Sequence, residues 1–337
     1  MGAFAFGLGI GTQNRRGEWL EVFYPQPLLA PGEALLDALG DGFDGGAVDP
    51  AALRNLARAC GEAGAAAQAT LATQLASTTR PCVATLLREN APPADVPAAF
   101  LKLQLLSRRL LRPHGTRLEG LFRVLRNVAW TSAGAIDPEE LPARQLEARL
   151  RGEMLRVHSV DKFPPMADYV VPSGVRIADT ARVRLGAYVG AGTTVMHEGF
   201  INFNAGSEGP GMIEGRVSAG VTVGAHSDLG GGCSTMGTLS GGGDIVISVG
   251  EHCLIGANAG IGIPLGDRCT VESGLYVTAG SKVTVLDADG HPRETLAARR
   301  LQGLSDLLFR RNSLSGAVEC LSNRSAVQLN DALHAHN

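Results

Sequence analysis

The stretch that decides the fold runs from Val171 to Ile201 and reads VPSGVRIADTARVRLGAYVGAGTTVMHEGFI. An aliphatic residue recurs in it at every sixth position without a miss, at Val171, Ile177, Val183, Val189, Val195 and Ile201. A helix buries every third or fourth residue and a strand every second one, so neither gives this period alone. A coil with three flat faces does, because each hexapeptide then forms one face with its aliphatic side chain directed inward.

The same period returns further along the chain. The later aliphatic positions are Val217, Val223 and Leu229, then Val249, Ile255 and Ile261, then Leu265, Val271, Val277 and Val283. A small residue often follows the aliphatic one, as in Val189-Gly190 and Ile255-Gly256, which permits a tight corner. The pattern predicts a parallel β-helix whose coils stack about 4.8 Å apart. Coincidental alternation in an ordinary β-sandwich is the weaker interpretation, because the hits are consecutive and repeated.

The period is interrupted twice, between Ile201 and Val217 and between Leu229 and Val249. We expect the intervening segments, Asn202 to Met212 and Gly231 to Asp244, to be loops extruded from the scaffold. Loops on a repetitive scaffold commonly carry function. The two breaks are therefore where a functional site is expected.

The regions on either side of the repeat have a different character. Apolar residues recur at helical spacing in Pro50 to Leu75, Asp95 to Leu111 and Pro138 to Val157, so the N-terminal region is predicted to be mainly helical. After the repeat, Glu294 to Leu301 and Val327 to Ala335 are predicted to be short helices. The expected division is a helical domain over residues 1–162, the β-helix over 163–287 and a small C-terminal cap over 288–337. Caps are needed because a β-helix has two open ends.

Composition excludes several classes of protein. The 337 residues carry a net charge of -3, which gives no basic surface for nucleic acid and no polybasic membrane anchor. The apolar N-terminus is too short for a membrane span and lacks the basic start of a signal peptide, so we expect a cytoplasmic protein. The six cysteines form no C-x-x-C pair and are interpreted as isolated buried thiols. The glycines of Gly7 to Gly11 are not followed by the strand-to-helix context of a dinucleotide site.

Four longer strings point to one family. They are Met212-Ile-Glu-Gly-Arg-Val-Ser-Ala-Gly220, Gly230-Gly-Gly-Cys-Ser-Thr-Met-Gly-Thr-Leu-Ser-Gly-Gly-Gly243, Gly256-Ala-Asn-Ala-Gly260 and Leu308-Phe-Arg-Arg-Asn-Ser313. The chain resembles the tetrahydrodipicolinate N-succinyltransferases in these strings, and more loosely in Gly11-Thr-Gln-Asn14 and the N-terminal region. The resemblance implies a mixed α and β protein built on a left-handed parallel β-helix of hexapeptide repeats. It also implies transfer of succinyl from succinyl-CoA to the amine of open-chain tetrahydrodipicolinate, in lysine and diaminopimelate biosynthesis.

Glu214 is the predicted catalytic residue. Acylation of an amine needs the nitrogen unprotonated, and a carboxylate near the acyl carbonyl can act as general base. By resemblance, the matching glutamate is instead the acyl carrier, which is nucleophilic catalysis through a mixed anhydride. The sequence does not choose between these roles. A purely structural pairing of Glu214 with Arg216 is the competing interpretation.

The residues expected at the CoA site rest on the resemblance and on simple chemistry. Arg216 falls at a succinyl-CoA contact by resemblance, and its guanidinium suits carboxylate or phosphate. Arg310 and Arg311 are further candidate cations, with Asn312 and Ser313 beside them in the tail. The remaining positions that match the family's CoA site are Gly231, Ser234, Ala257, Glu272, Ser273 and Lys282.

The resemblance also gives expectations for a metal site, for the oligomeric state and for the residues that contact the acceptor substrate. A glutamate at the position of Glu198 helps bind Mg²⁺ on the three-fold axis of relatives, but this chain has Ala181 where some of them supply a second acid. A homotrimer is expected, with sites between subunits, because a narrow coil leaves little room for an internal pocket. Candidate cations for the acceptor are Arg184 and Arg216, and Asn202, Asn204 and Ser218 are candidate neutral contacts. Two alternatives stay open: acetyl-CoA as the donor, and a non-catalytic or metal-binding β-helix scaffold. A catalytic zinc anhydrase on such a scaffold is disfavoured, because it would need several histidine ligands and the coil region offers only His197, His226 and His252.

Overall fold

The computed structural model describes residues 2–40, 43, 45–237 and 245–322 of the chain. The chain forms two compact units. The N-terminal unit comprises Met1–Leu105 and Gly115–Pro164, and the β-helix unit comprises Leu106–His114 and Pro165–Asn337. Across the described residues, the helices are all too short or too polar to cross a lipid bilayer.

The N-terminal unit mixes helices with antiparallel sheet. All three predicted helical stretches contain helices, and strands that the sequence interpretation did not include lie between them. A sheet with the order β2-β1-β5-β4 carries β3 on β1, and a second sheet has the order β7-β6-β8. The elements are β1 (Ala5–Gln13), β2 (Trp19–Phe23), β3 (Leu28–Leu29), α1 (Glu33–Leu39), β4 (Gly46–Val48), α2 (Pro50–Glu62), α3 (Ala66–Leu75), β5 (Cys82–Leu87), α4 (Val96–Ser107), α5 (Leu121–Val124), β6 (Val128–Thr131), β7 (Gly134–Ile136), α6 (Leu141–Leu150) and β8 (Val157–Asp161).

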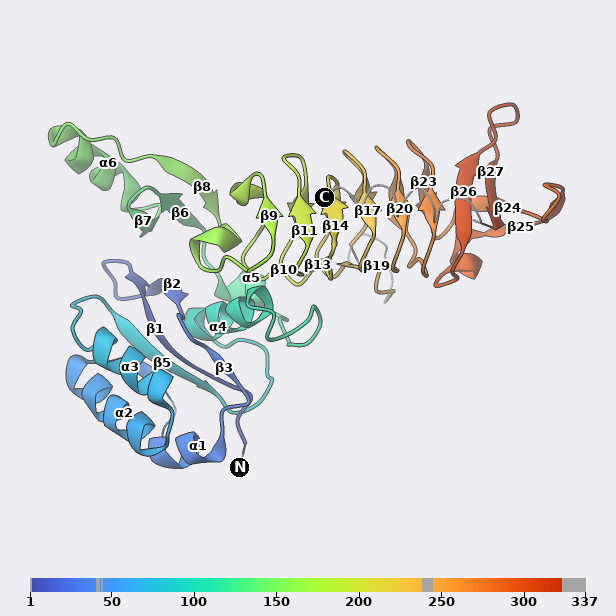
Figure 1. Cartoon of the computed structure of the whole chain (residues 1–337). Helices are drawn as coiled ribbons and strands as arrows, with labels where there is room; N and C mark the ends of the chain where they lie inside the picture. Colours follow the sequence, from blue (N-terminus) through green and yellow to red (C-terminus); the bar gives the residue numbers. More distant parts are fainter. Residues whose placement is uncertain (1, 41–42, 44, 238–244, 323–337) are drawn as a thin grey trace. The chain divides into compact units, whose positions relative to one another are not determined.

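The glycines at the start of the chain have a packing role. They alternate along β1 with Phe6 and Leu8, which are buried in a cluster with residues of α2 and α3. These two helices lie against the sheet that contains β1 (Figure 1). A Cβ on Gly9 would lie 2.8 Å from the ring of Tyr24, so this face of the strand has no room for side chains. β1 continues into β2 through a hairpin rather than into a helix. The glycine motif therefore serves close packing of the sheet, consistent with the rejection of a dinucleotide site.

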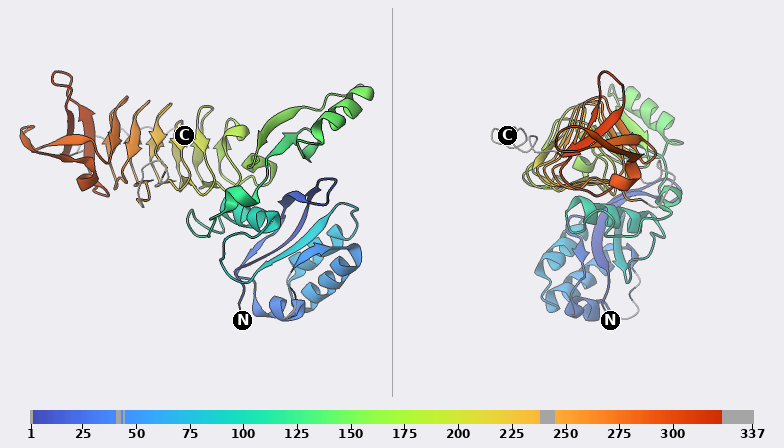
Figure 2. Two further views of the ribbon diagram at one scale, coloured as in Figure 1. Left: turned by 180° about the vertical axis from the view of Figure 1, so that it is seen from behind. Right: turned by 90° about the vertical axis from the view of Figure 1, so that its right-hand side faces the viewer.

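The β-helix unit confirms the predicted left-handed parallel β-helix. Its coils follow one another along the axis in Figure 1 and overlap in the end-on view at the right of Figure 2. Face 1 comprises β9 (Arg176–Ile177), β11 (Thr193–Val195), β14 (Gly211–Ile213), β17 (Asp228–Leu229), β20 (Leu254–Ile255) and β22 (Thr270–Val271). Face 2 comprises β12 (Phe200–Ile201), β15 (Arg216–Val217), β18 (Ser234–Thr235), β21 (Gly260–Gly262) and β23 (Tyr276–Thr278). Face 3 comprises β10 (Tyr188–Val189), β13 (Gly206–Ser207), β16 (Thr222–Val223) and β19 (Ser248–Val249).

The aliphatic residues of the period line the interior in register. Ile213 pairs with Leu229 and Leu229 with Ile255 on face 1, and all three are at most 1% exposed. Val183 is the first fully inward residue of face 2, where it bridges to Ile201. Val171 is the exception, because it is 73% exposed. Its predicted inward position is wrong: the neighbouring Val170 and Met166 close this end of the core instead.

The first predicted break is wrong, because Asn202 to Met212 is a regular part of a coil. β13 pairs with β10 and β16, and β14 pairs with β11 and β17. The inward position six residues after Ile201 is Ser207, which is fully buried. Its hydroxyl accepts hydrogen bonds from the Thr193 hydroxyl at 3.3 Å and from the backbone nitrogen of Gly209 at 3.2 Å. A buried polar group is tolerated when it is hydrogen-bonded, so the period continues with a serine that a hydrophobic pattern cannot detect.

The second break is shorter than predicted. Ser234 and Thr235 form β18 between β15 and β21, and Thr235 is a buried inward residue. The part of Gly231 to Asp244 that precedes residue 238 therefore belongs to the coil. Residues 238–244 lie outside the described part of the chain.

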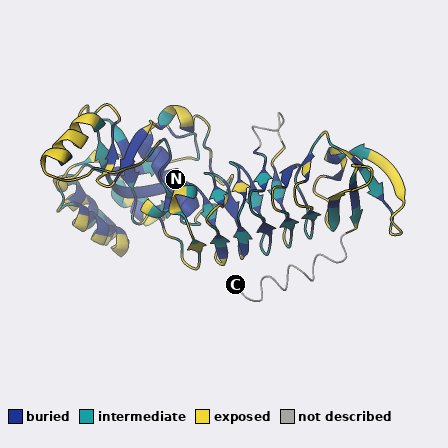
Figure 3. Cartoon of the chain, turned by 90° about the horizontal axis from the view of Figure 1, so that it is seen from above, coloured by how far each residue is buried: buried dark blue, intermediate teal, exposed yellow. Residues whose placement is uncertain are grey.

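The β-helix ends in a cap of four strands. They are β24 (Lys282–Leu286), β25 (Pro292–Ala297), β26 (Leu307–Arg311) and β27 (Val318–Ser322). β26 continues face 1 by pairing with β22. The predicted helix over Glu294 to Leu301 is wrong in its first half: β25 pairs antiparallel with β24 as an exposed edge strand, and Ala298–Leu301 forms a 3₁₀ helix (Figure 3). Pairing with β24 overrides the local helix preference. The predicted helix at Val327 to Ala335 lies outside the described residues.

Candidate functional site

Most of the predicted site residues lie along one edge of the β-helix, where face 1 turns into face 2. The backbone nitrogen of Glu214 donates to Leu229 O at 2.8 Å, and the nitrogens of Gly230 and Gly256 donate in the same way to Ile255 and Val271 at 2.8 Å. Glu272 N then donates to Phe309 O at 2.9 Å. We call this edge the corner ladder. It comprises Glu214, Gly230, Gly231, Gly256, Ala257, Glu272, Ser273, Arg310 and Arg311.

Glu214 stands at one end of the corner ladder. Its side chain is partly exposed, and its carboxylate has no hydrogen-bond or ion-pair partner within the described ranges. A Cβ on Gly231 of the next coil would lie 3.5 Å from Glu214 Oε2, so the glycine keeps the space beside the carboxylate open. A carboxylate with this freedom can accept a proton or attack an electrophile.

Arg216 does not pair with Glu214, so the structural interpretation of that pair is not supported in the residues described. Arg216 is exposed on face 2, in register with Ser234 of the next coil. Thr235 holds the backbone here, because its hydroxyl donates to Arg216 O at 2.9 Å and accepts from Ser218 N at 3.1 Å. The sequence interpretation missed Thr235. The available signal was its place six residues after Leu229, where the period requires an inward residue.

Gly215 allows Glu214 and Arg216 to lie on either side of a tight corner. A Cβ at this position would collide with the sulfur of Cys233. Burial raises the pKa of the Cys233 thiol to about 12, so the sulfur stays protonated at neutral pH. All six cysteines are buried and free of disulfides, as the sequence interpretation expected. Cys233 is therefore a packing residue beneath the site and not a thiolate nucleophile.

Small residues let the coils stack closely along the corner ladder. A Cβ on Gly230 would lie 2.7 Å from Ala257 N, and one on Gly256 would lie 2.5 Å from Ser273 N. Ala257 and Ser273 are exposed. The ladder therefore presents a shallow surface of backbone and short side chains beyond Glu214.

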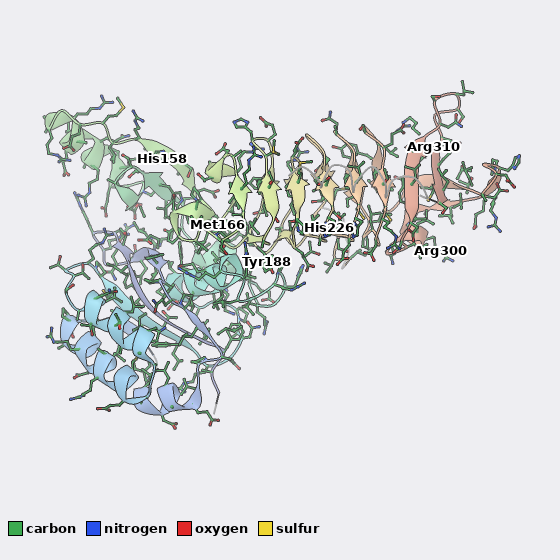
Figure 4. All side chains as sticks on the ribbon, in the orientation of Figure 1. His158, Met166, Tyr188, His226, Arg300 and Arg310 are labelled. Atoms are coloured by element: carbon green, nitrogen blue, oxygen red, sulfur yellow. The ribbon has the colours of Figure 1, made fainter. Side chains whose placement is uncertain are left out.

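The far end of the ladder is built by the tail strands, where Figure 4 labels Arg310 (Figure 4). Arg310 Nε donates to Glu319 Oε2 at 2.9 Å, and Asn312 Nδ2 donates to Glu319 Oε1 at 2.7 Å. These bonds, with that of Asn312 the largest cause, hold the pKa of Glu319 below its usual value. Arg310 and Asn312 are thus engaged within the tail. Arg311 keeps an exposed guanidinium that donates to Gly316 O at 3.0 Å, and Ser313 is also exposed.

Two predicted residues, Lys282 and Glu198, are not part of the corner ladder. Lys282 is exposed on β24, opposite Ala297 of β25, and among the residues that the structure describes no hydrogen bond or ion pair joins it to the ladder. Glu198 is on the same edge one coil before Glu214, and its carboxylate lies 3.1 Å from His197 Nδ1. Mg²⁺ prefers about six oxygen ligands. One exposed carboxylate beside an imidazole, with Ala181 in the preceding coil, does not fit that requirement within one chain.

A cavity of about 440 Å³ lies elsewhere, in the N-terminal unit. Thr12, Arg80, Asp137 and Arg144 are among its lining residues. None of the predicted site residues lines it, so it does not belong to the corner ladder.

Comparison with known proteins gives the family. A family model described as the middle region of tetrahydrodipicolinate N-succinyltransferase matches residues 125–164, and one described as a hexapeptide repeat of succinyl-transferase matches residues 246–279. The chain is 64% identical over 340 residues to a 2,3,4,5-tetrahydropyridine-2,6-dicarboxylate N-succinyltransferase of Pseudomonas putida, covering 99% of this chain and 98% of the relative. It is 57% identical over 343 residues to the Vibrio cholerae protein of the same name, with complete coverage of both.

A solved structure agrees with the sequence relatives. The crystal structure of a Campylobacter jejuni protein described as a 2,3,4,5-tetrahydropyridine-2-carboxylate N-succinyltransferase superposes with a TM-score of 0.86 at 30% identity. The match covers 96% of this chain and 93% of that one. Fold, repeat and full-length identity agree: the chain belongs to the tetrahydrodipicolinate N-succinyltransferase family of hexapeptide-repeat enzymes.

Proposed function

We propose that the protein transfers the succinyl group of succinyl-CoA to the amine of open-chain tetrahydrodipicolinate, 2-amino-6-oxopimelate, in lysine and diaminopimelate biosynthesis. The observation that carries the proposal is the position of Glu214, whose carboxylate has no partner among the described residues and lies at one end of a surface ladder that ends at the exposed guanidinium of Arg311. The full-length relatives bear the name of this activity. Residues 163–287 form the acyltransferase domain in this proposal, flanked by residues 1–162 and 288–337.

Glu214 has two possible roles in the chemistry. As acyl carrier, its carboxylate attacks the thioester carbonyl, the carbon–sulfur bond breaks, and CoA leaves as a thiolate that takes up a proton. The amine then attacks the mixed anhydride and restores the carboxylate. As general base, Glu214 instead accepts the proton of the amine while the amine attacks the thioester directly, and the proton passes to the CoA thiolate that leaves as the carbon–sulfur bond breaks. Both roles need the open space above Gly231 and a carboxylate without a fixed partner.

The donor has a natural path along the corner ladder. Four strand spacings separate Glu214 from Arg310, or roughly 19 Å at about 4.8 Å each. We place the acyl end at Glu214, the arm over Gly231, Ala257 and Ser273, and the phosphates toward Arg311. Arg216, with Ser234 beside it, is the cation for the terminal carboxylate of the succinyl group.

The acceptor is a dianion and needs cations and donors of its own. Arg184 Nη1 donates to Asn202 Oδ1 at 3.2 Å, and the Arg184 guanidinium lies 5.8 Å from the centre of the Phe200 ring. Asn204 Oδ1 already accepts from the backbone of His114 at 2.8 Å. Asn202 Oδ1 likewise accepts from Phe203 N at 2.9 Å, and the Ser218 hydroxyl donates to Thr235 O. We therefore keep Asn202, Asn204 and Ser218 together as neutral acceptor contacts beside the cation Arg184.

We propose that the enzyme is a homotrimer. The interior of the coils is filled by buried aliphatic side chains, and Glu214 and Arg216 lie on the outer surface. An outer edge becomes a deep site only when a second surface faces it. No step of this mechanism runs through a metal, and a Mg²⁺ site at Glu198 would need the copies of this carboxylate from the other subunits of the trimer. Light scattering during size-exclusion chromatography tests the assembly, and a fully active monomer would refute it.

A thiol-release assay tests the proposed function. We expect CoA release from succinyl-CoA in the presence of an aminopimelate acceptor, with acetyl-CoA giving a much lower rate. Glu214→Gln should lower kcat by about a thousandfold, because either role needs the carboxylate. Glu251→Gln is the matched control, since Glu251 is an exposed glutamate on a different edge of the coils. Near-normal turnover of Glu214→Gln would remove Glu214 from either role.

A single-turnover experiment separates the two roles. Succinyl-CoA is mixed with the enzyme without acceptor, and free thiol is followed at equimolar concentrations. A burst of one thiol per active site supports the acyl carrier. Absence of a burst, with normal turnover once acceptor is added, supports the general base.

A further inference from the structure

The strand β21 of face 2 has glycine at both of its outward positions. Ile261 points inward and is fully buried, while Gly260 and Gly262 face outward on either side of it. Side chains from the neighbouring coils cover both glycines. The strand therefore forms the floor of a small surface built by residues of three coils.

The two covering side chains converge on this floor. Tyr276 follows Gly260 in register on the next coil, and a Cβ on Gly260 would collide with ring atoms Cδ1 and Cε1 of Tyr276. Met236 comes from the preceding coil, and a Cβ on Gly262 would lie 2.8 Å from its sulfur. Tyr276 and Met236 thus lie over β21 from opposite sides. We call Gly260, Gly262, Tyr276 and Met236 the β21 platform.

The β21 platform leaves apolar surface exposed. Tyr276 is 47% exposed, and its hydroxyl has no recorded partner in the part of the chain described by the structure. Its register continues through Gly260 to Ser234 and then to Arg216, so the platform lies on the same face as the proposed donor contacts. An aromatic ring and a thioether that lie against a glycine floor offer an apolar surface for an apolar segment of a ligand.

We propose that the β21 platform binds the pantetheine arm of the acyl donor and so positions the thioester at Glu214. The inference rests on the proposed function, because the donor's path follows the corner ladder. Ala257 and Ser273 of that ladder precede Gly260 and Tyr276 by three residues each, in the same coils. An arm that passes Ala257 and Ser273 therefore runs beside the platform. Its short apolar segments pack on the ring and thioether, and its amides stay at the backbone of the corner.

Distance excludes the acyl group as the occupant. Tyr276 is three coils beyond Arg216, which amounts to roughly 14 Å at about 4.8 Å per coil. Its ring leans back by one coil, which still leaves roughly 10 Å. A four-carbon acyl chain whose carbonyl is at Glu214 does not reach that far. The platform consequently contacts the arm and not the transferred group.

Steady-state kinetics of Tyr276 variants tests the proposal. Tyr276→Ala should raise KM for succinyl-CoA about tenfold, with kcat and the KM of the acceptor changed less than about twofold. Tyr276→Phe keeps the ring and should resemble the wild type. Tyr188→Ala is the matched control, because Tyr188 lies on β10 of face 3 (Figure 4). An unchanged KM for succinyl-CoA in Tyr276→Ala would overturn the proposal.

Fragments of the donor locate the contact. Inhibition by pantetheine should weaken in Tyr276→Ala by the same factor as KM, while inhibition by adenosine 3′,5′-bisphosphate should not change. Equal weakening of both fragments would overturn the assignment to the arm. Calorimetry measures the binding of coenzyme A without any reaction, so it tests the platform separately from the proposed function. If the wild type shows no turnover, the proposed function fails. The platform then stands only if Tyr276→Ala binds coenzyme A about tenfold more weakly than the wild type.

Discussion

The carboxylate of Glu272 accepts a hydrogen bond from the backbone nitrogen of Arg311 at 2.6 Å. The backbone nitrogen of Glu272 also donates to Phe309 O at 2.9 Å, so this one residue joins the last coil to the tail strand β26 twice. The resemblance places Glu272 at the CoA site. The structure gives it a second task, which is to fix the backbone that carries the exposed Arg311 guanidinium.

Two substitutions at Glu272 separate positioning from direct contact. Glu272→Ala removes the acceptor for Arg311 N and should raise KM for succinyl-CoA about fivefold, since one net hydrogen bond contributes about 1 kcal/mol. Glu272→Gln keeps an acceptor oxygen and should stay within about twofold of the wild type. If Gln is as harmful as Ala, the charge of Glu272 acts directly on the ligand and the positioning role is incorrect.

Gly215→Ala should destabilise the β-helix unit. The added methyl group collides with the Cys233 sulfur, and overpacking of this kind costs about 1–3 kcal/mol. Urea unfolding followed by circular dichroism measures the change. Gly280→Ala is the control, because a Cβ there meets no atom within 4 Å and should alter stability by less than about 0.5 kcal/mol. Equal effects of the two variants would contradict the close approach at Cys233.

Because of Lys102, we expect the free energy of unfolding of the N-terminal unit to rise with pH in the alkaline range. Lys102 is 1% exposed, and its Nζ donates to Asn90 Oδ1 and Thr116 Oγ1 at 2.8 Å, both of them neutral. Burial lowers the pKa of Lys102 from 10.5 to about 8. The unfolded chain therefore binds the proton more tightly than the folded one between these values, and stability rises with pH through that window.

The measurement compares the wild type with Lys102→Met at several pH values. The difference in unfolding free energy between the two should shift by about 3 kcal/mol in favour of the wild type from pH 7.5 to pH 10.5. Lys282→Met, at an exposed lysine, should show no such shift. A difference that does not vary with pH would mean that Lys102 titrates alike in the folded and unfolded states.

The sequence predicted the β-helix because its period is a direct consequence of inward packing. The errors came where packing is not hydrophobic. Ser207 and Thr235 occupy inward positions as hydrogen-bonded hydroxyl groups, so two regular coils looked like interruptions. Glu294 to Ala297 looked helical because strand pairing with β24 is a long-range effect that local propensity does not contain.

The residues of the candidate site were predictable from the sequence, but their arrangement in space was not. Glu214 and Arg216 were recognisable from a family string, and their neighbours Gly231 and Ser234 from another. Their juxtaposition depends on the number of residues in each coil, because Ile213 to Val217 is a four-residue step and not six. The cover that Tyr276 and Met236 provide over β21 was not predictable, since it needs the register of three coils.

The corner ladder turns the number of coils into a measure of length. Each coil between Glu214 and Arg311 adds one strand spacing, about 4.8 Å, to the gap between the reacting carboxylate and the distal cation. Removing a coil would shorten that gap by the same step without altering a single side chain at either end. The number of coils therefore sets the distance between the Glu214 carboxylate and the Arg311 guanidinium. An insertion that forms a loop outside the coil leaves this distance unchanged. Duplication of a coil lengthens it and would favour a longer ligand.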